Sequence, residues 1–390
     1  MSRVVVAIVL GAAVGLVLAA DLSRASLYSP EDPTLAVPVG ADGKAHAMKF
    51  NDFLLALTKL NNALDMRMII NGEANKDREA FLERIKASEK IQNPSVDVKA
   101  ARATDLLRVG ELDRAINLLI PLTRDRRPSY FVFLTLSHVY AARGDWGEAI
   151  RFHQEGLLDT EMPQTVKGLT SAQRDWWKKL DTQYLPRFYK LRLDETESHK
   201  GLSQTELAKR NETEEVLPLF PLPDSDPPKT PVRFVNDAGV YQPSHLAAAE
   251  QAKLPADAIA IVQQLLLWFP GETRLYWLLA ELYAASNNLR DAAILFERCS
   301  WSRQYGNRKV MMEHRTAVQS AVPKDPPPED APLTLPETDS PQTPEPQSPD
   351  QTPISMKTIW YYFGAIGLIV VFAFIRAMSR RGNRNCGPVG

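Results

Sequence analysis

The chain has 390 residues, and 44% of them are apolar, which is sufficient for two or three domains with hydrophobic cores. Its 46 basic and 47 acidic residues give a net charge of −1, and no stretch before the extreme C-terminus is dense in lysine or arginine, which argues against nucleic acid as a main partner. The two cysteines, Cys299 and Cys386, are too few and too far apart for a disulfide framework or a CxxC metal site.

An apolar segment opens the chain. Residues 4–20 are apolar or glycine, follow Arg3 and end at Asp21. A basic residue before such a run is typical of a secretory signal peptide or of an uncleaved N-terminal anchor, so residues 1–20 are predicted to be one of the two. Residues 21–43 contain prolines and glycines and predict an irregular lead-in.

Helical periodicity dominates residues 44–195. Apolar residues recur at helical spacing from Phe50 onward, and residues 77–87 predict a second helix. A later helix is predicted over 170–195, where Pro186 kinks or divides it. Strand signals are almost absent, so an all-α fold is expected.

Two stretches inside this region repeat one pattern. Residues 107–116 read LRVGELDRAI and residues 141–150 read AARGDWGEAI, so glycine, an acid, an apolar residue, two variable positions and Ala-Ile recur thirty-four residues later. This is the period of a helix–turn–helix unit that stacks on copies of itself. Glycine ends the first helix in a left-handed conformation, and alanine lets the two helices cross closely.

A second set of copies is predicted over residues 240–322, after a polar and proline-rich linker at 196–239. Asn287 replaces the turn glycine there, which is reasonable because asparagine also tolerates positive φ, and Ala292 follows at the same distance. Ala258 indicates a poorer copy that starts near residue 240, and residues 307–322 predict a capping helix.

The best copy, residues 130–163, carries a set of matching positions in order: Phe133, Leu136, Ser137, Tyr140, Gly144-Asp145-Trp146, Ala149, Gly156 and Pro163. This set resembles the tetratricopeptide repeat family, in its membrane-anchored bacterial form. The resemblance implies a solenoid of helical hairpins in two parts that binds extended peptides or helices of partner proteins along a concave groove.

The C-terminal part is predicted to tether the protein. Residues 323–356 are rich in proline and acid and predict a disordered stalk. Residues 357–376 are apolar with aromatic residues at their entry, which is typical of a transmembrane helix. The tail, residues 377–390, contains several arginines, so the positive-inside rule predicts that it lies in the cytoplasm. The repeats are then predicted to lie on the other side of a bacterial inner membrane, in the periplasm.

The repeat register predicts which side chains line the groove, with Trp277 and Phe131 as exposed anchors and Arg108 and Arg274 as carboxylate clamps. The predicted groove residues are Arg108, Phe131, Leu134, His138, Arg274, Trp277 and Glu281. The alternative is that these side chains pack against the chain's own helices, especially 170–195, whose two tryptophans need burial.

No catalytic pattern is present. The histidines show no metal-ligand spacing, and neither a GxSxG elbow nor a phosphate-binding loop occurs. No cofactor, metal or small-molecule substrate is therefore expected, and Cys299 is expected to be a packed thiol. The sequence predicts a non-enzymatic scaffold for other envelope proteins. Two alternatives stay open: a tail-anchored cytosolic adaptor, and an envelope enzyme with its site in residues 164–240.

Overall fold

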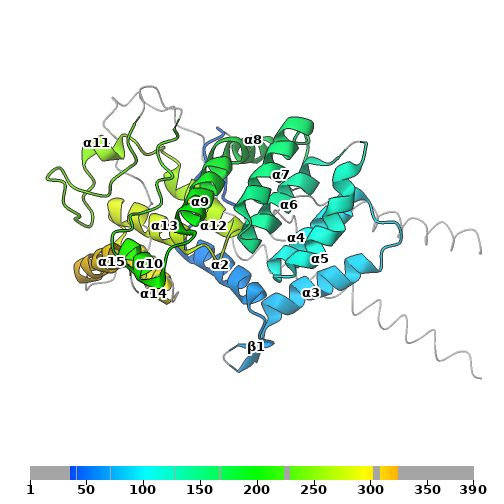
Figure 1. Cartoon of the computed structure of the whole chain (residues 1–390), viewed down its shortest axis with the longest axis horizontal. Helices are drawn as coiled ribbons and strands as arrows, with labels where there is room; N and C mark the ends of the chain where they lie inside the picture. The colour runs from blue at the N-terminus through cyan, green and yellow to red at the C-terminus, as the bar shows by residue number, and fades with distance from the viewer. Residues whose placement is uncertain are drawn as a thin grey trace, which may run out of the picture. The chain divides into compact units, whose positions relative to one another are not determined.

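The computed structural model describes residues 36–323, except residues 41, 71, 127, 167, 224–228 and 302–307 (Figure 1). The predicted signal segment or anchor, the transmembrane helix, the tail and, apart from Pro323, the stalk lie outside the described residues, as does Cys386. All described residues belong to one compact unit, Met1–Pro336. This part of the chain is mostly helical, which confirms the all-α class, and none of its helices is long and apolar enough to cross a bilayer.

Helices between residues 76 and 199 form what we call the first array. Most of them pack on their neighbours in the chain, α4 also packs on α6, and α7 packs on α9. Its members are α3 (Lys76–Glu89), α4 (Val96–Arg108), α5 (Leu112–Leu119) with the 3₁₀ turn η2 (Ile120–Arg124), α6 (Tyr130–Arg143), α7 (Trp146–Asp159), α8 (Ser171–Lys179), the π-helical turn η3 (Leu180–Tyr184) and α9 (Leu185–His199).

The π-helical turn divides the predicted 170–195 helix just before Pro186. Proline has no N–H to donate to the preceding turn, so the backbone must widen there to keep its other hydrogen bonds. The expected division at Pro186 is therefore present, as a widened turn and not as a break.

The second array follows at residues 258–321. Its members are α12 (Ala258–Trp268), α13 (Thr273–Ala285), α14 (Leu289–Trp301) and α15 (Lys309–Ala321). The N-terminal helix α2 (Phe50–Leu64) joins this array although it was predicted with the first: Asn61 Nδ2 donates to Tyr276 Oη at 3.0 Å, and Arg298 Nη2 donates to Thr58 Oγ1 at 3.2 Å. Because α2 also contacts α3 and α4, it links the two arrays.

Three hairpins share one turn geometry. Gly110, Gly144 and Asn287 all have positive φ, between 63° and 84°. Each turn closes with the same two backbone hydrogen bonds: Gly144 N–H donates to Ala141 O at 2.9 Å and Asp145 N–H donates to Tyr140 O at 2.9 Å, and the other two turns repeat both bonds. This is a Schellman C-cap, which the left-handed residue makes possible.

Small residues lie where paired helices meet. Ala115, Ala149 and Ala292, each five residues after its turn residue, are completely buried. At Gly156 of α7 an added Cβ would come within 2.8 Å of the Cβ of Phe133 in α6. Cys299 occupies the corresponding position of the second array and is also buried, so the expected packed thiol is found.

Two predictions for residues 196–257 are wrong. The poorer fourth copy was expected to begin with a helix near residue 240, but only the short α11 (Ala248–Gln251) lies there, and α12 takes its helical partner from α2. The stretch 196–239, expected as a surface linker, contains α10 (Gln204–Glu212) and a segment whose apolar side chains are buried in the core. Proline content alone does not decide whether an extended segment is buried.

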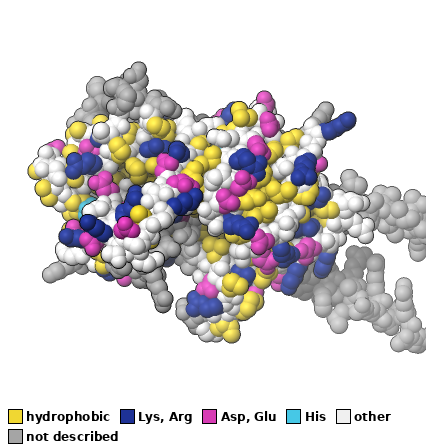
Figure 2. All heavy atoms as spheres, in the orientation of Figure 1, with side chains coloured by type: hydrophobic (Ala, Val, Ile, Leu, Met, Phe, Trp, Pro, Cys, Tyr) yellow, Lys and Arg dark blue, Asp and Glu magenta, His cyan; other side chains and the backbone are white. Residues whose placement is uncertain are grey.

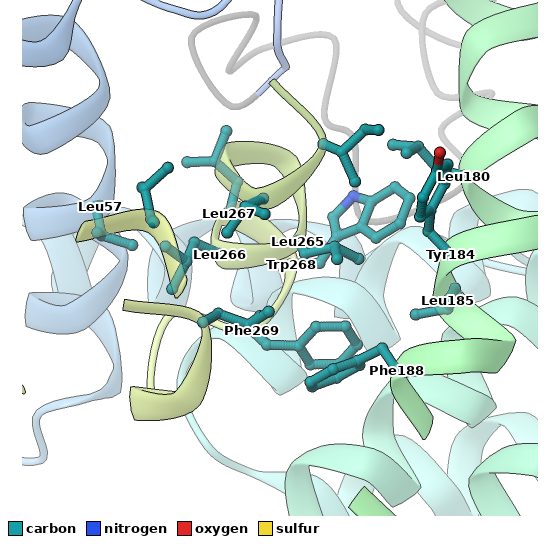
Figure 3. Close-up of a cluster of buried hydrophobic side chains, with 14 of the residues drawn as sticks. Leu57, Leu180, Tyr184, Leu185, Phe188, Leu265, Leu266, Leu267, Trp268 and Phe269 are labelled. Carbon is teal, nitrogen blue, oxygen red and sulfur yellow. The ribbon is translucent and has the colours of Figure 1, made fainter. Parts of the chain in front are cut away.

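The core is continuous through α12, every residue of which is buried. Figure 3 shows its side chains between Leu57 of α2 on one side and Tyr184 and Phe188 on the other. Its two glutamines are satisfied by the irregular N-terminal segment: Met48 N–H donates to Gln263 Oε1 at 2.7 Å, and Val37 N–H donates to Gln264 Oε1 at 3.0 Å. The two predicted repeat regions therefore form one packed body.

Candidate functional site

The C-terminal end of α12, together with Phe269 that follows it, packs against the predicted groove residues Arg108 and His138 of the first array. Arg108 of α4 donates from Nη1 to Leu267 O at 2.8 Å. The ring of His138 in α6 stacks on Phe269, with centroids 4.9 Å apart, and meets the edge of Trp268 at 5.4 Å. Since α12 belongs to the second array, the chain occupies its own groove.

The predicted groove residues of the first array are accordingly buried. Phe131 and Leu134 are each 4% exposed, and Arg108 is 3% exposed. Phe131 is therefore not an exposed anchor, and Arg108 binds backbone carbonyl oxygens of the chain itself. The physical reason is the apolar character of α12, which is buried along its whole length and whose C-terminal end contacts these residues of the first array.

The predicted groove residues of the second array are buried as well. Trp277 is 0% exposed and donates from Nε1 to Glu281 Oε1 at 2.8 Å. The same carboxylate oxygen lies 2.7 Å from Nδ1 of His314, on the capping helix α15, and His314 stacks on Tyr241. The expected exposure of Trp277 is wrong, because its side chain is fully buried, and Glu281, to which it donates, also contacts His314 of α15. In both arrays, therefore, the predicted groove residues pack against the chain's own helices, which is the alternative expectation from the sequence.

Arg274 does bind a carboxylate, but one of its own chain. Its Nη1 lies 2.5 Å from Glu214 Oε1, and its Nε lies 3.7 Å from Glu195 Oε2. Arg308 pairs with the second oxygen of Glu214. Both arginines are 6% exposed, so this ion-pair cluster is sheltered from water.

Burial and the arginines act on these carboxyl groups in opposite directions. Burial raises the pKa of Glu214, and Arg274 and Arg308 only partly oppose this effect. For Glu195 burial also raises the pKa, but Arg274 and Arg192 outweigh it, so the pKa is lowered overall. Both arginines therefore favour the charged form of Glu214, and burial disfavours it.

A cavity of about 600 Å³ adjoins the cluster. Its walls come from α9 and from the segment after α10. On the face shown in Figure 2, basic and acidic side chains intermingle over the region of α9, α10 and α15. The lining residues include Leu191, Glu195 and His199 of α9, and Thr213, Glu214 and Leu217.

Sequence reasoning missed this cluster. Glu214 lies within a stretch expected to be a linker, and its partner Arg274 follows sixty residues later in another array. An acidic pair in a proline-rich stretch is usually solvent-exposed, so no local pattern marks it.

A second polar cluster lies inside the first array. Tyr130 donates to Asp181 Oδ2 at 2.7 Å, and both residues are buried. His138 has no hydrogen-bond partner for either ring nitrogen among the described residues. Burial raises the pKa of Asp181 to about 7, against the effect of its hydrogen bond with Tyr130, and burial lowers the pKa of His138 well below its usual range.

Within the described part of the chain, no group of three or more histidine, cysteine, aspartate or glutamate side chains is arranged to hold a metal ion. A scan against protein-family models finds no match to this chain, and a search of curated proteins finds no significant match.

Proposed function

We propose that this protein is a non-catalytic scaffold of tetratricopeptide-like repeats, tethered to a bacterial inner membrane, that brings other envelope proteins together in the periplasm. The observation that carries the proposal is the shared hairpin turn at Gly110, Gly144 and Asn287, with a buried alanine five residues after each. Stacked hairpins of this kind generally act as binding surfaces for other proteins.

The occupied groove changes where binding is expected. Because the predicted groove residues are buried by the chain's own packing, a partner would bind at surfaces outside the array interiors. The cavity between α9 and the segment after α10 is our candidate for this role, since polar and apolar side chains converge there on open space.

The proposed compartment can be tested with thiol labelling of the full-length L158C variant in spheroplasts. Leu158 is 83% exposed in α7, Cys299 is buried, and Cys386 lies in the predicted cytoplasmic tail. A membrane-impermeant maleimide is expected to label the introduced thiol at position 158 in intact spheroplasts and Cys386 only after the membrane is permeabilised, as peptide mass spectrometry would show.

The native Cys386 serves as the control on the opposite side. In a cytosolic adaptor with both thiols inside the cell, neither thiol would be labelled in intact spheroplasts. In a tail-anchored adaptor whose tail crosses to the outside, Cys386 would be labelled first and the introduced thiol would be protected. Either outcome would refute the periplasmic scaffold.

A further inference from the structure

Residues 213–222, which we call the strap, form a segment without regular secondary structure that packs on helices of both arrays. They follow α10, which has no buried residue, and they belong to no helix or strand. Their backbone is held by side chains of the helices: Arg187 Nη2 donates to Pro218 O at 3.0 Å, and Arg274 Nη1 donates to Glu215 O at 3.1 Å. Arginine donors on main-chain carbonyls are a means of holding an extended peptide whatever its side chains.

The strap also inserts apolar side chains. Leu217, Leu219 and Phe220 are between 0% and 2% exposed, and the ring of Phe220 meets the edge of Tyr184 in η3 at 5.9 Å. Burial of three large side chains from so short a segment supplies most of its attachment.

An acidic residue near the start of the strap forms ion pairs with two arginines. Glu214 faces Arg274 at 2.5 Å and pairs with Arg308, so charge complementarity fixes the register of the peptide. Arg274 belongs to α13, and Arg308 immediately precedes α15. The second array therefore holds the N-terminal end of the strap, and α9 and η3 of the first array hold the residues that follow.

The strap is not sealed under other parts of the structure. The cavity of about 600 Å³ is walled on one side by the strap itself, through Thr213, Glu214, Leu217 and Pro218. Open space along a bound peptide gives a competing peptide a place to begin binding while the strap is still partly attached.

We propose that the groove holding the strap is a binding site for an extended segment of a partner protein, and that the strap occupies it in cis as a competing ligand. The partner segment would carry an acidic residue for Arg274 and Arg308, followed after two residues by an apolar–Pro–apolar–aromatic sequence. This inference rests on the proposed scaffold function and specifies how a partner is admitted: only a segment that displaces the strap is bound.

The test uses a fluorescent peptide of residues 211–222, NETEEVLPLFPL, and the full chain in detergent micelles, read by fluorescence anisotropy. The wild-type chain is expected to bind the peptide weakly, because the strap fills the groove. L219D places a charge at a fully buried strap position, releases the strap and leaves the arginines intact. The variant is expected to bind the peptide at least tenfold more tightly than the wild type, since more of the groove is free.

Controls separate specific binding from adhesion to exposed apolar surface. R274Q in the L219D background is expected to abolish the gain, and a peptide with glutamine in place of the acid corresponding to Glu214 is expected to bind at least tenfold more weakly. Equal binding by wild type and L219D, or binding that R274Q does not change, would refute the proposal.

A milder variant covers the case in which L219D does not fold. E214Q removes only the charge of the strap, and it is expected to bind the peptide more tightly than wild type does. In addition, hydrogen exchange of the Leu219 amide, which donates to Leu217 O at 2.8 Å, is expected to accelerate when excess peptide is added to the wild type. Unchanged binding by E214Q with unchanged exchange would refute cis occupancy. None of these readouts depends on the membrane side, which the thiol labelling tests separately.

Discussion

Single buried polar residues set how the first array responds to pH. Asp181 is completely buried, and burial raises its pKa from 3.8 to about 7. Between these two values the folded chain holds a proton that the unfolded chain does not, so its contribution to stability falls as the pH rises through this window. His153 acts in the opposite direction: burial lowers its pKa from 6.5 to about 4, so its contribution falls as the pH drops below its ordinary value.

The isosteric variant D181N separates the two effects. It keeps an acceptor for the Tyr130 hydroxyl and carries no charge, so it avoids the cost of ionising a buried acid. We expect it to be more stable than wild type at pH 8 by roughly 1–4 kcal/mol, and this advantage to shrink toward pH 4.

The measurement is guanidinium unfolding of the full chain at pH 4.5, 6 and 8, followed by tryptophan fluorescence. D125N, the same substitution at an exposed residue, is the control and should follow wild type at every pH. A constant stability difference between D181N and wild type across this range would contradict the assignment.

At the scale of paired helices, stability depends on how closely α6 and α7 approach. Gly156 is the contact point, because a Cβ there would lie 2.8 Å from the Cβ of Phe133, well inside normal contact distance. The same hairpin offers a comparison at Gly147 of α7, where an added Cβ would meet nothing within 4 Å.

The pair G156A and G147A therefore tests close packing without changing anything but one methyl group. We expect G156A to lose about 1–3 kcal/mol of unfolding free energy through forced separation of the helices. G147A should be neutral or slightly stabilising, because alanine favours helix over glycine. Thermal and denaturant unfolding would measure both, and equal effects of the two variants would contradict the predicted crossing.

Across the whole molecule, the insertion of α12 makes the two arrays a single cooperative body. Phe269 stacks on His138 and lies 5.2 Å from Phe188, so it belongs to the second array in sequence and to the first array in its contacts (Figure 3). Helical repeat arrays normally unfold through nearest-neighbour steps. Here a helix of one array is buried in the other, so loosening either should loosen both.

F269A tests this coupling. Truncating the buried ring is expected to cost about 3–5 kcal/mol, and amide exchange should accelerate together in α4–α9 and in α13–α15. L158A, at a side chain 83% exposed, should change stability by less than about 0.5 kcal/mol. Acceleration confined to one array would contradict a single cooperative body.

Local patterns predicted the hairpins well for a physical reason. A residue with positive φ such as Gly144, followed five residues later by a small residue such as Ala149, is required by the geometry of one turn and one crossing. That requirement is visible within a few residues of sequence. The helices α2, α3 and α15 were likewise predicted from apolar spacing, and the structure confirms them.

Long-range packing could not be predicted in this way. The contact of Arg108 with Leu267 spans 159 residues, and the Glu214–Arg274 pair joins an expected linker to a distant helix. Apolar spacing shows which face of a helix is buried, but not which other element covers it. For this reason the sequence predicts Trp277 and Phe131 in an open groove, although both side chains are buried in the core.

The pairing of α2 with α12 has a consequence for biosynthesis. Met48, two residues before α2, donates its N–H to Gln263, 215 residues later, so the segment that leads into α2 meets this neighbour only after most of the polypeptide has emerged from the ribosome. Until then Leu57, which lies beside side chains of α12 and ends completely buried, lacks this part of its covering (Figure 3). Completion of the core must wait for the synthesis of α12, so the final packing of this body is reached late in translation.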